Sequence, residues 1–200
     1  MVRTRVGYCG GASESPTYQR IGDHSESVEI DYDPRVVTYG DLLAEFFAGH
    51  DARARAFSTQ YRSAIFCRTD EERAAAERAL QSLQVALGLL HASIEPLTRF
   101  WIAEDYHQKF RLRGHNRIAG ELRALMPDER AFIDSTSAAR LNAWVDGWGS
   151  TEQVERELPL TGLSRSAQDE VLSYAGRREH VKEAQAEKES AHALRGRTYR

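Results

Sequence analysis

A stretch near the start of the chain places an acidic side chain where it could take part in chemistry. Residues 23–34 (DHSESVEIDYDP) alternate in polarity, which is typical of a strand with two different faces. The face expected to meet solvent carries four polar side chains: Ser25, Ser27, Glu29 and Asp31. The other face carries Glu26 with Val28 and Ile30 and is expected to point inward. Desolvation there would favour a protonated carboxyl that donates to a substrate oxygen. The alternative is a rim residue that points to water.

The two cysteines offer little chemistry by their spacing alone. Cys9 and Cys67 are far apart and lack the spacing of a metal site, so neither a metal centre nor a structural disulfide is expected. Cys67 closes an apolar run and is interpreted as a buried small hydrophobic residue. Cys9 stands beside Gly10 and Gly11, in a turn where a thiol can be exposed.

Composition narrows the class of protein. Hydrophobic residues make up 41% of the 200 residues and charged residues 28%, as in globular proteins that work in water. The net charge of −3 argues against nucleic-acid binding, which needs a basic face. The sequence has no apolar run long enough to span a membrane and does not begin like a signal peptide, so no membrane association and a cytoplasmic location are expected.

Strand-like and helix-like segments alternate over the first half of the chain. Strands are expected at 2–9, 23–34, 59–67 and 91–97, with an aromatic loop at 99–102. Helices are expected after Thr38, which forms a capping box with Asp41, from Thr69, and over 104–110. This order predicts an α/β (α+β) layer structure over residues 1–113.

The rest of the chain reads as helical only. Residues 114–175 are predicted to form a helical extension, followed by a charged tail at 176–200. The extension is expected to pack on the first domain or on another copy of the chain. Its apolar residues that need burial are Leu122, Leu125, Phe132, Ile133, Leu141 and Trp144.

Four motifs together resemble the peptide methionine sulfoxide reductase A family. They are GYCGG with PTY (residues 7–18), GDHSESVE (22–29), TQYRSAI (59–65) and AEDYHQ (103–108). The resemblance covers about residues 2–110 and is closest to a bacterial branch with a helical C-terminal extension. It implies a two-layer sandwich with a mixed sheet, followed here by an all-helical extension.

The resemblance also implies a reaction and its residues. In the family a cysteine thiolate attacks the sulfur of methionine sulfoxide, an acid protonates the oxygen, and the resulting sulfenic acid is reduced through a disulfide by thioredoxin or another thiol. Glu26 corresponds to the acid, and Tyr18 and Tyr61 to the hydroxyls that hold the oxygen. Residues expected to contact the substrate are Phe100, Trp101, Asp105 and His107. No cofactor is expected.

Two departures from the family pattern affect the expected activity. The family nucleophile lies in a Gly-Cys-Phe-Trp motif upstream of the strand that here begins at Val2, and this segment is absent from the sequence. The family aspartate before Tyr61 is also absent, and Ala56 or Phe57 falls near its place. We therefore interpret the chain as N-terminally truncated relative to the family, and expect its first strand to have an unpaired or uncovered side.

Several functions remain open at this level. The first is thiol-dependent repair of oxidised methionine by a reductase. In this reading the sequence as given starts or ends at the wrong place and so lacks the segment with the nucleophile. The second is a non-catalytic or decayed relative that binds oxidised methionine or a protein partner. In the third, Cys9 replaces the nucleophile, which needs an accessible thiol with a lowered pKa. A scaffold acting through the C-terminal helices is the fourth.

Overall fold

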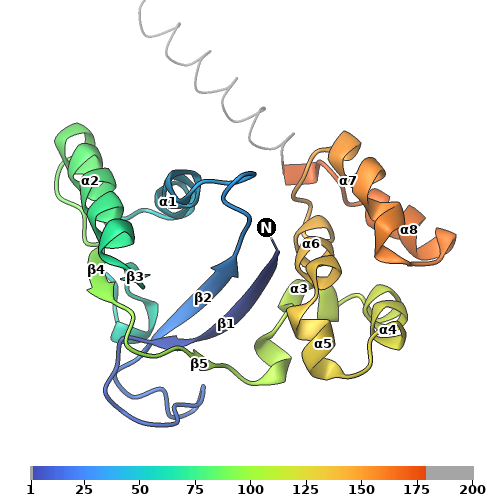
Figure 1. The fold of residues 1–200 in the computed structure, drawn as a ribbon, viewed down its shortest axis with the longest axis horizontal. Helices are drawn as coiled ribbons and strands as arrows, with labels where there is room; N and C mark the ends of the chain where they lie inside the picture. Colours follow the sequence, from blue (N-terminus) through green and yellow to red (C-terminus); the bar gives the residue numbers. More distant parts are fainter. Residues whose placement is uncertain (1, 179–200) are drawn as a thin grey trace, which may run out of the picture. The chain divides into compact units, whose positions relative to one another are not determined.

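The chain forms two compact units, which are described separately. The computed structural model describes residues 2–178 (Figure 1), and the units divide between Gln108 and Lys109, close to the predicted boundary after residue 113. Most of the predicted charged tail, from residue 179 on, lies outside the described residues. Within residues 2–178, no helix is long and apolar enough to cross a membrane.

The first unit is built on a small antiparallel sheet. Strand β1 (Arg3–Cys9) lies between β2 (Ser25–Asp31) and β5 (Trp101–Ile102). A second, parallel pair joins β3 (Ala64–Cys67) to β4 (Ser93–Pro96). The α+β class is confirmed, and antiparallel and parallel pairs both occur, divided between two small sheets (Figure 1).

Two helices contribute to the core beside the parallel pair. In α1 (Tyr39–Ala48) the predicted capping box is confirmed: the Asp41 N–H donates to the Thr38 hydroxyl at 3.1 Å, and the Thr38 N–H donates to the Asp41 carboxylate at 2.8 Å. The longer α2 (Asp70–Leu87) begins after the cap Thr69. Its buried Ala76 belongs to the same core cluster as Leu43, Ile65 and Cys67.

The two faces of β2 were assigned the wrong way round. Val28, expected to be inward, is 59% exposed and Glu26 is exposed, whereas Ser25 is 1% exposed. The cause is the partner strand, because Arg5 of β1 pairs with Glu29 at 2.6 Å. The acidic face is thereby neutralised and covered, and both side chains of this pair are only 14% exposed.

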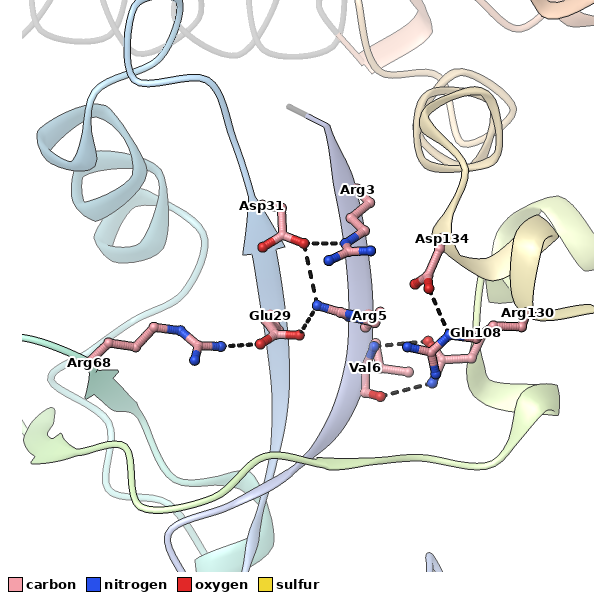
Figure 2. Close-up of polar contacts among 9 residues, drawn as sticks. All are labelled: Arg3, Arg5, Val6, Glu29, Asp31, Arg68, Gln108, Arg130 and Asp134. Carbon is pink, nitrogen blue, oxygen red and sulfur yellow. Dashed lines mark hydrogen bonds and ion pairs between the residues drawn. The ribbon is translucent and has the colours of Figure 1, made fainter.

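The ion pairs form a ladder across β1, β2 and the end of β3 (Figure 2). Arg3 pairs with Asp31, Arg5 reaches both Glu29 and Asp31, and Arg68 pairs with Glu29. Partly buried and shared by several charges, such a ladder resists salt screening better than isolated surface pairs do. It fixes β2 beside β1 in one register.

Three local predictions need correction. The strand expected at 59–67 begins only at Ala64, and η1 (Thr59–Tyr61) is a 3-10 turn whose Thr59 carbonyl accepts from the Ser25 hydroxyl at 2.9 Å. The helix expected over 104–110 is split into η2 (Asp105–His107) and α3 (Phe110–Arg113), because Lys109 has a left-handed φ of 52°. The loop expected at 99–102 contains the short strand β5.

The loop that leads from β1 toward Tyr18 is held by two side chains. Buried His24 accepts from the Gly11 N–H at Nδ1 (3.1 Å), so its Nε2–H donates to the Ser13 carbonyl (2.7 Å). The Asp23 carboxylate accepts from the Ala12 N–H at 2.7 Å and from the Ser13 hydroxyl at 2.6 Å. The Ser13 hydroxyl and the backbone N–H groups hold the pKa of Asp23 well below its usual range.

Within residues 109–178 the second unit contains helices and no strand, and it has its own core. Its elements are α3, α4 (Asn116–Ala124), α5 (Glu129–Asp134), α6 (Thr136–Trp144), α7 (Thr151–Glu157), η3 (Leu158–Thr161) and α8 (Arg165–Leu172). Five of the apolar residues named above are buried in this core: Leu122, Phe132, Ile133, Leu141 and Trp144. Leu125 was wrongly expected to be buried: it is 55% exposed, because α4 has already ended and Leu125 is its C-cap.

Of the two alternatives expected for strand β1, an unpaired edge and an uncovered face, the unpaired edge is not found at Gly7 and Tyr8. Strand β1 pairs with β2 along its length and with β5 at Gly7 and Tyr8. Beside Val6 the buried side chain of Gln108 continues the pairing: its Oε1 accepts from the Val6 N–H at 3.0 Å, and its Nε2–H donates to the Val6 carbonyl at 2.8 Å (Figure 2). The exposed apolar surface lies instead on β2, at Val28.

Replacing this amide with an apolar group tests the arrangement. Gln108→Leu keeps the volume but takes this partner from the Val6 N–H, whereas the Val6 C=O still accepts from the Ala103 N–H at 3.0 Å. We expect the free energy of unfolding to fall by about 2 kcal/mol. The measurement is urea unfolding at neutral pH. The control Gln81→Leu, on an exposed position of α2, should change stability by less than about 0.5 kcal/mol. Equal effects of the two substitutions would contradict the assignment.

The Asp23 clamp predicts a dependence of stability on pH. Because its pKa is lowered in the folded chain, Asp23 adds stability that is complete above the ordinary aspartate pKa of 3.8 and is lost as pH falls through the folded value. Asp23→Asn should therefore destabilise the chain at pH 7 and do so progressively less below pH 4. Urea unfolding across this range checks it, with Asp70→Asn, whose side chain is 88% exposed, as control. A difference that stays constant with pH would refute the clamp.

Candidate functional site

A hollow of about 380 Å³ lies on the uncovered side of β1 and β2; we call it the Glu26 hollow. The residues that line it are Val6, Gly7, Tyr8, Tyr18, Glu26, Ser27, Val28, Ala103 and His107. Three of the predicted site residues lie together here: Glu26 from β2, Tyr18 from the loop after β1 and His107 from the turn η2. The apolar wall is provided by Val6 and Val28, which are cross-strand neighbours.

Glu26 is positioned by strand register. It stands opposite Tyr8, and directly opposed residues of an antiparallel pair point to the same side of the sheet. Its carboxylate accepts a hydrogen bond from the Gln60 side-chain amide at 2.5 Å. Gln60 belongs to the turn η1, so the same turn that carries Tyr61 also holds Glu26. The carboxylate remains open to a ligand because the residue is exposed.

Tyr18 and Tyr61 meet at the edge of the Glu26 hollow. A hydrogen bond with the Tyr18 side chain is the main cause of the raised pKa of Tyr61, with partial burial, the charge of Tyr18 and that of Glu26 adding to it. Both tyrosines are exposed, so their hydroxyls face a space that a ligand can enter. Phe57 packs against Tyr61, with ring centres 5.2 Å apart. This contact occurs near the place where the resemblance implies an aspartate.

His107 contributes an imidazole to the same wall. Its ring lies 4.7 Å from that of Tyr18 and 4.2 Å from that of Tyr106, measured between ring centres. Its Nε2 is buried and has no hydrogen-bond partner within residues 2–178. An unpartnered buried nitrogen costs free energy, so the arrangement favours a ligand that supplies a partner.

Sequence reasoning missed a carboxylate at the base of this wall. Glu104 accepts from the Tyr8 hydroxyl at 2.7 Å and from the Tyr18 N–H at 3.1 Å, which joins β1 to the loop of Tyr18. The available signal was Tyr8, which is only 2% exposed: a buried phenol requires an acceptor, and Glu104 is the acidic residue nearest to strand β5 in the sequence.

The other residues that were predicted to contact the substrate do not all lie at the Glu26 hollow. Trp101 stands opposite Tyr8 on β5, so it shares the side of the sheet with Glu26, and the Arg99 guanidinium lies 3.5 Å from its ring centre. Phe100 contacts Gly7 and lines a different hollow, of about 310 Å³, together with Cys9. Asp105 is exposed in η2 and does not line the Glu26 hollow.

Neither cysteine lines the Glu26 hollow, although Cys9 lines a neighbouring hollow that shares Glu26, Ser27 and Val28 with it. Both cysteines are free thiols, and the exposed fraction is 2% for Cys9 and 4% for Cys67. Burial raises the pKa of each thiol; for Cys9 a hydrogen bond with the Ser27 hydroxyl opposes this only in part. Cys9 follows Tyr8 in β1, so its side chain points to the opposite face of the sheet. The lining of the Glu26 hollow includes no cysteine.

Comparisons with known proteins point to one family. The family model described as peptide methionine sulfoxide reductase matches residues 1–138. The Drosophila melanogaster peptide methionine sulfoxide reductase is 36% identical over 167 residues, covering 82% of this chain and 67% of its own. Peptide methionine sulfoxide reductase A5 of Arabidopsis thaliana is 38% identical, covering 72% of this chain and 59% of its own.

A solved structure is also similar. Mxr1 of Saccharomyces cerevisiae in its reduced form superposes with a TM-score of 0.53 at 28% sequence identity, covering 56% of this chain and 71% of that one. This chain spans 59–67% of the length of the first relatives it matches. The extent of the family match, over most of the chain, decides the assignment: the chain belongs to the peptide methionine sulfoxide reductase family.

Proposed function

We propose that the Glu26 hollow binds methionine sulfoxide. In peptide-methionine (S)-S-oxide reduction its residues would hold and protonate the sulfoxide oxygen. The single observation that carries this proposal is that Glu26 and Tyr18 line one hollow beside an apolar wall, with Tyr61 close enough to Tyr18 and Glu26 for both to raise its pKa. The family membership supports the same activity.

The chemistry of a sulfoxide suits this arrangement. Its oxygen carries partial negative charge and accepts hydrogen bonds, so two phenolic hydroxyls and a carboxyl that has taken up a proton are suitable donors. The methyl and methylene groups on sulfur need apolar contacts. Val6 and Val28 line the hollow, and Trp101 lies on the same side of the sheet.

The complete reaction balances with thiols as the only reductant. A thiolate attacks the sulfur, the S–O bond breaks as the oxygen is transferred to the thiol, and methionine and a sulfenic acid result. A second thiol then forms a disulfide with the sulfenic sulfur and releases water. Glu26 would deliver a proton to the oxygen, while Tyr18 and Tyr61 would stabilise its developing charge.

Turnover needs a reactive thiol at the hollow. Burial and a raised pKa make Cys9 and Cys67 poor nucleophiles, and Cys9 points to the other side of the sheet. We therefore propose that residues 1–200 alone bind the sulfoxide without reducing it. The second candidate function, a non-catalytic binder of oxidised methionine, is favoured by this same observation.

The partner and compartment follow from the reaction. We propose a dithiol protein such as thioredoxin as the reductant wherever a reactive thiol completes the site, with no cofactor involved. A reducing compartment such as the cytoplasm suits both the chemistry and the two free cysteines. Methionine sulfoxide in proteins, or as the free amino acid, is the proposed substrate.

Binding is tested with the two sulfoxide epimers of N-acetylmethionine amide by titration calorimetry. We expect the S epimer to bind and Tyr61→Phe or Tyr18→Phe to weaken its affinity about five- to tenfold each, since each removes one hydrogen bond worth about 1 kcal/mol. The control Tyr174→Phe, in the second unit, should leave affinity unchanged. Equal losses in the control would mean that the tyrosines do not bind the oxygen.

Turnover is tested by loss of the S-sulfoxide in the presence of dithiothreitol. The chain and its Cys9→Ser form should both be inactive, because phenols and a carboxyl cannot attack sulfur. A version with a Gly-Cys-Phe-Trp segment placed ahead of Met1 should be active, and its cysteine-to-serine form inactive. Activity in the chain that disappears in Cys9→Ser would instead identify Cys9 as the nucleophile.

A further inference from the structure

We infer that Glu104 is a positioning residue of the Glu26 hollow: it holds Tyr18 and Tyr8 in place and acts on the ligand only through them. The inference rests on the proposed function, because it assigns a role in binding the sulfoxide oxygen. Glu104 is not among the residues that line the hollow. Its effect must therefore pass through the residues it contacts.

The first contact involves Tyr8. The Tyr8 hydroxyl donates to Glu104 at 2.7 Å, and burial, followed by this hydrogen bond and the charge of Glu104, raises the pKa of Tyr8. The phenol consequently stays protonated, with its proton directed at Glu104. Tyr8 lines the hollow, but its hydroxyl already donates its hydrogen bond to Glu104. The phenolic donors left for a ligand oxygen in the proposed function are those of Tyr18 and Tyr61.

The second contact holds the backbone of Tyr18. The Tyr18 N–H donates to the other oxygen of Glu104 at 3.1 Å, while the Tyr18 ring packs on His107. Glu104 is the residue at the start of the turn η2 that also carries His107. Tyr18 is thereby held at two points by one short segment, although it sits in a loop whose side chains are largely exposed.

The electrostatics are consistent with an ionised carboxylate. Partial burial acts to raise the pKa of Glu104, but the hydrogen bonds from Tyr8 and from backbone N–H groups, with the charge of His107, lower it overall. Hydrogen bonds to a charged acceptor are stronger than those between neutral groups. One ionised side chain thus sets the position of the hydroxyl that meets Tyr61.

Glu104→Gln tests the inference, since it removes the charge and keeps the shape. Three quantities are measured: affinity for the S-sulfoxide, thermal unfolding, and the titration of Tyr8 by the ¹³Cζ shift of labelled tyrosine, assigned with Tyr8→Phe. We expect affinity to fall roughly tenfold while the chain stays folded. The pKa of Tyr8 should decrease, yet remain above the ordinary tyrosine value, because burial is its largest cause. The charge-matched control Glu45→Gln, exposed on α1, should change none of these.

A double-mutant cycle separates positioning from general support of the fold. If Glu104 acts through Tyr18, then Tyr18→Phe should weaken binding far less in the Glu104→Gln background than in the original chain. Glu104→Asp serves if Glu104→Gln does not fold: it keeps the charge but is too short for both hydrogen bonds. It should lose affinity while the raised pKa of Tyr8 is largely kept.

Each result decides between specific statements. Additive losses for Glu104 and Tyr18, or an affinity within twofold of the original chain, would overturn the positioning role. An unchanged Tyr8 titration in Glu104→Gln would overturn the hydrogen bond on which the inference rests. Failure of the unsubstituted chain to bind the sulfoxide would overturn the proposed function and the inference with it.

Discussion

The register between β1 and β2 is the constraint on which the site depends. It places Tyr8 opposite Glu26 and Val6 opposite Val28, so that an acid, a phenol and an apolar wall share one face. A shift of one residue would send Glu26 to the other side of the sheet. The ion-pair ladder opposes such a shift, because Arg5 stands directly opposite Glu29 in this register.

The same register separates thiols from oxygen donors. Residues alternate across a strand, so the side chain of Cys9 leaves β1 on the face opposite to Tyr8. Burial then makes the thiol both inaccessible and less acidic. The described part of the chain therefore presents groups that can hold a polarised oxygen, and keeps its sulfur chemistry away from them.

Much of the site is built from turns held by side chains. The turn η1 brings Gln60 and Tyr61 to Glu26, and Glu104, at the start of η2, holds the loop of Tyr18. Short turns without a ladder of backbone hydrogen bonds need such external partners to keep one conformation. In the second unit the helices bury their apolar residues in a core of their own.

The sequence by itself determined the elements with strong local signals. Local sequence pattern predicts the capping box at Thr38, the strand at 3–9 and five buried residues of the extension. The motifs predict the family. Only the tertiary structure decided which face of β2 is covered, because alternation defines two faces but the arginines of β1 select one. It likewise revealed Glu104, whose partners Tyr8 and Tyr18 are distant in sequence and meet it only in the folded chain.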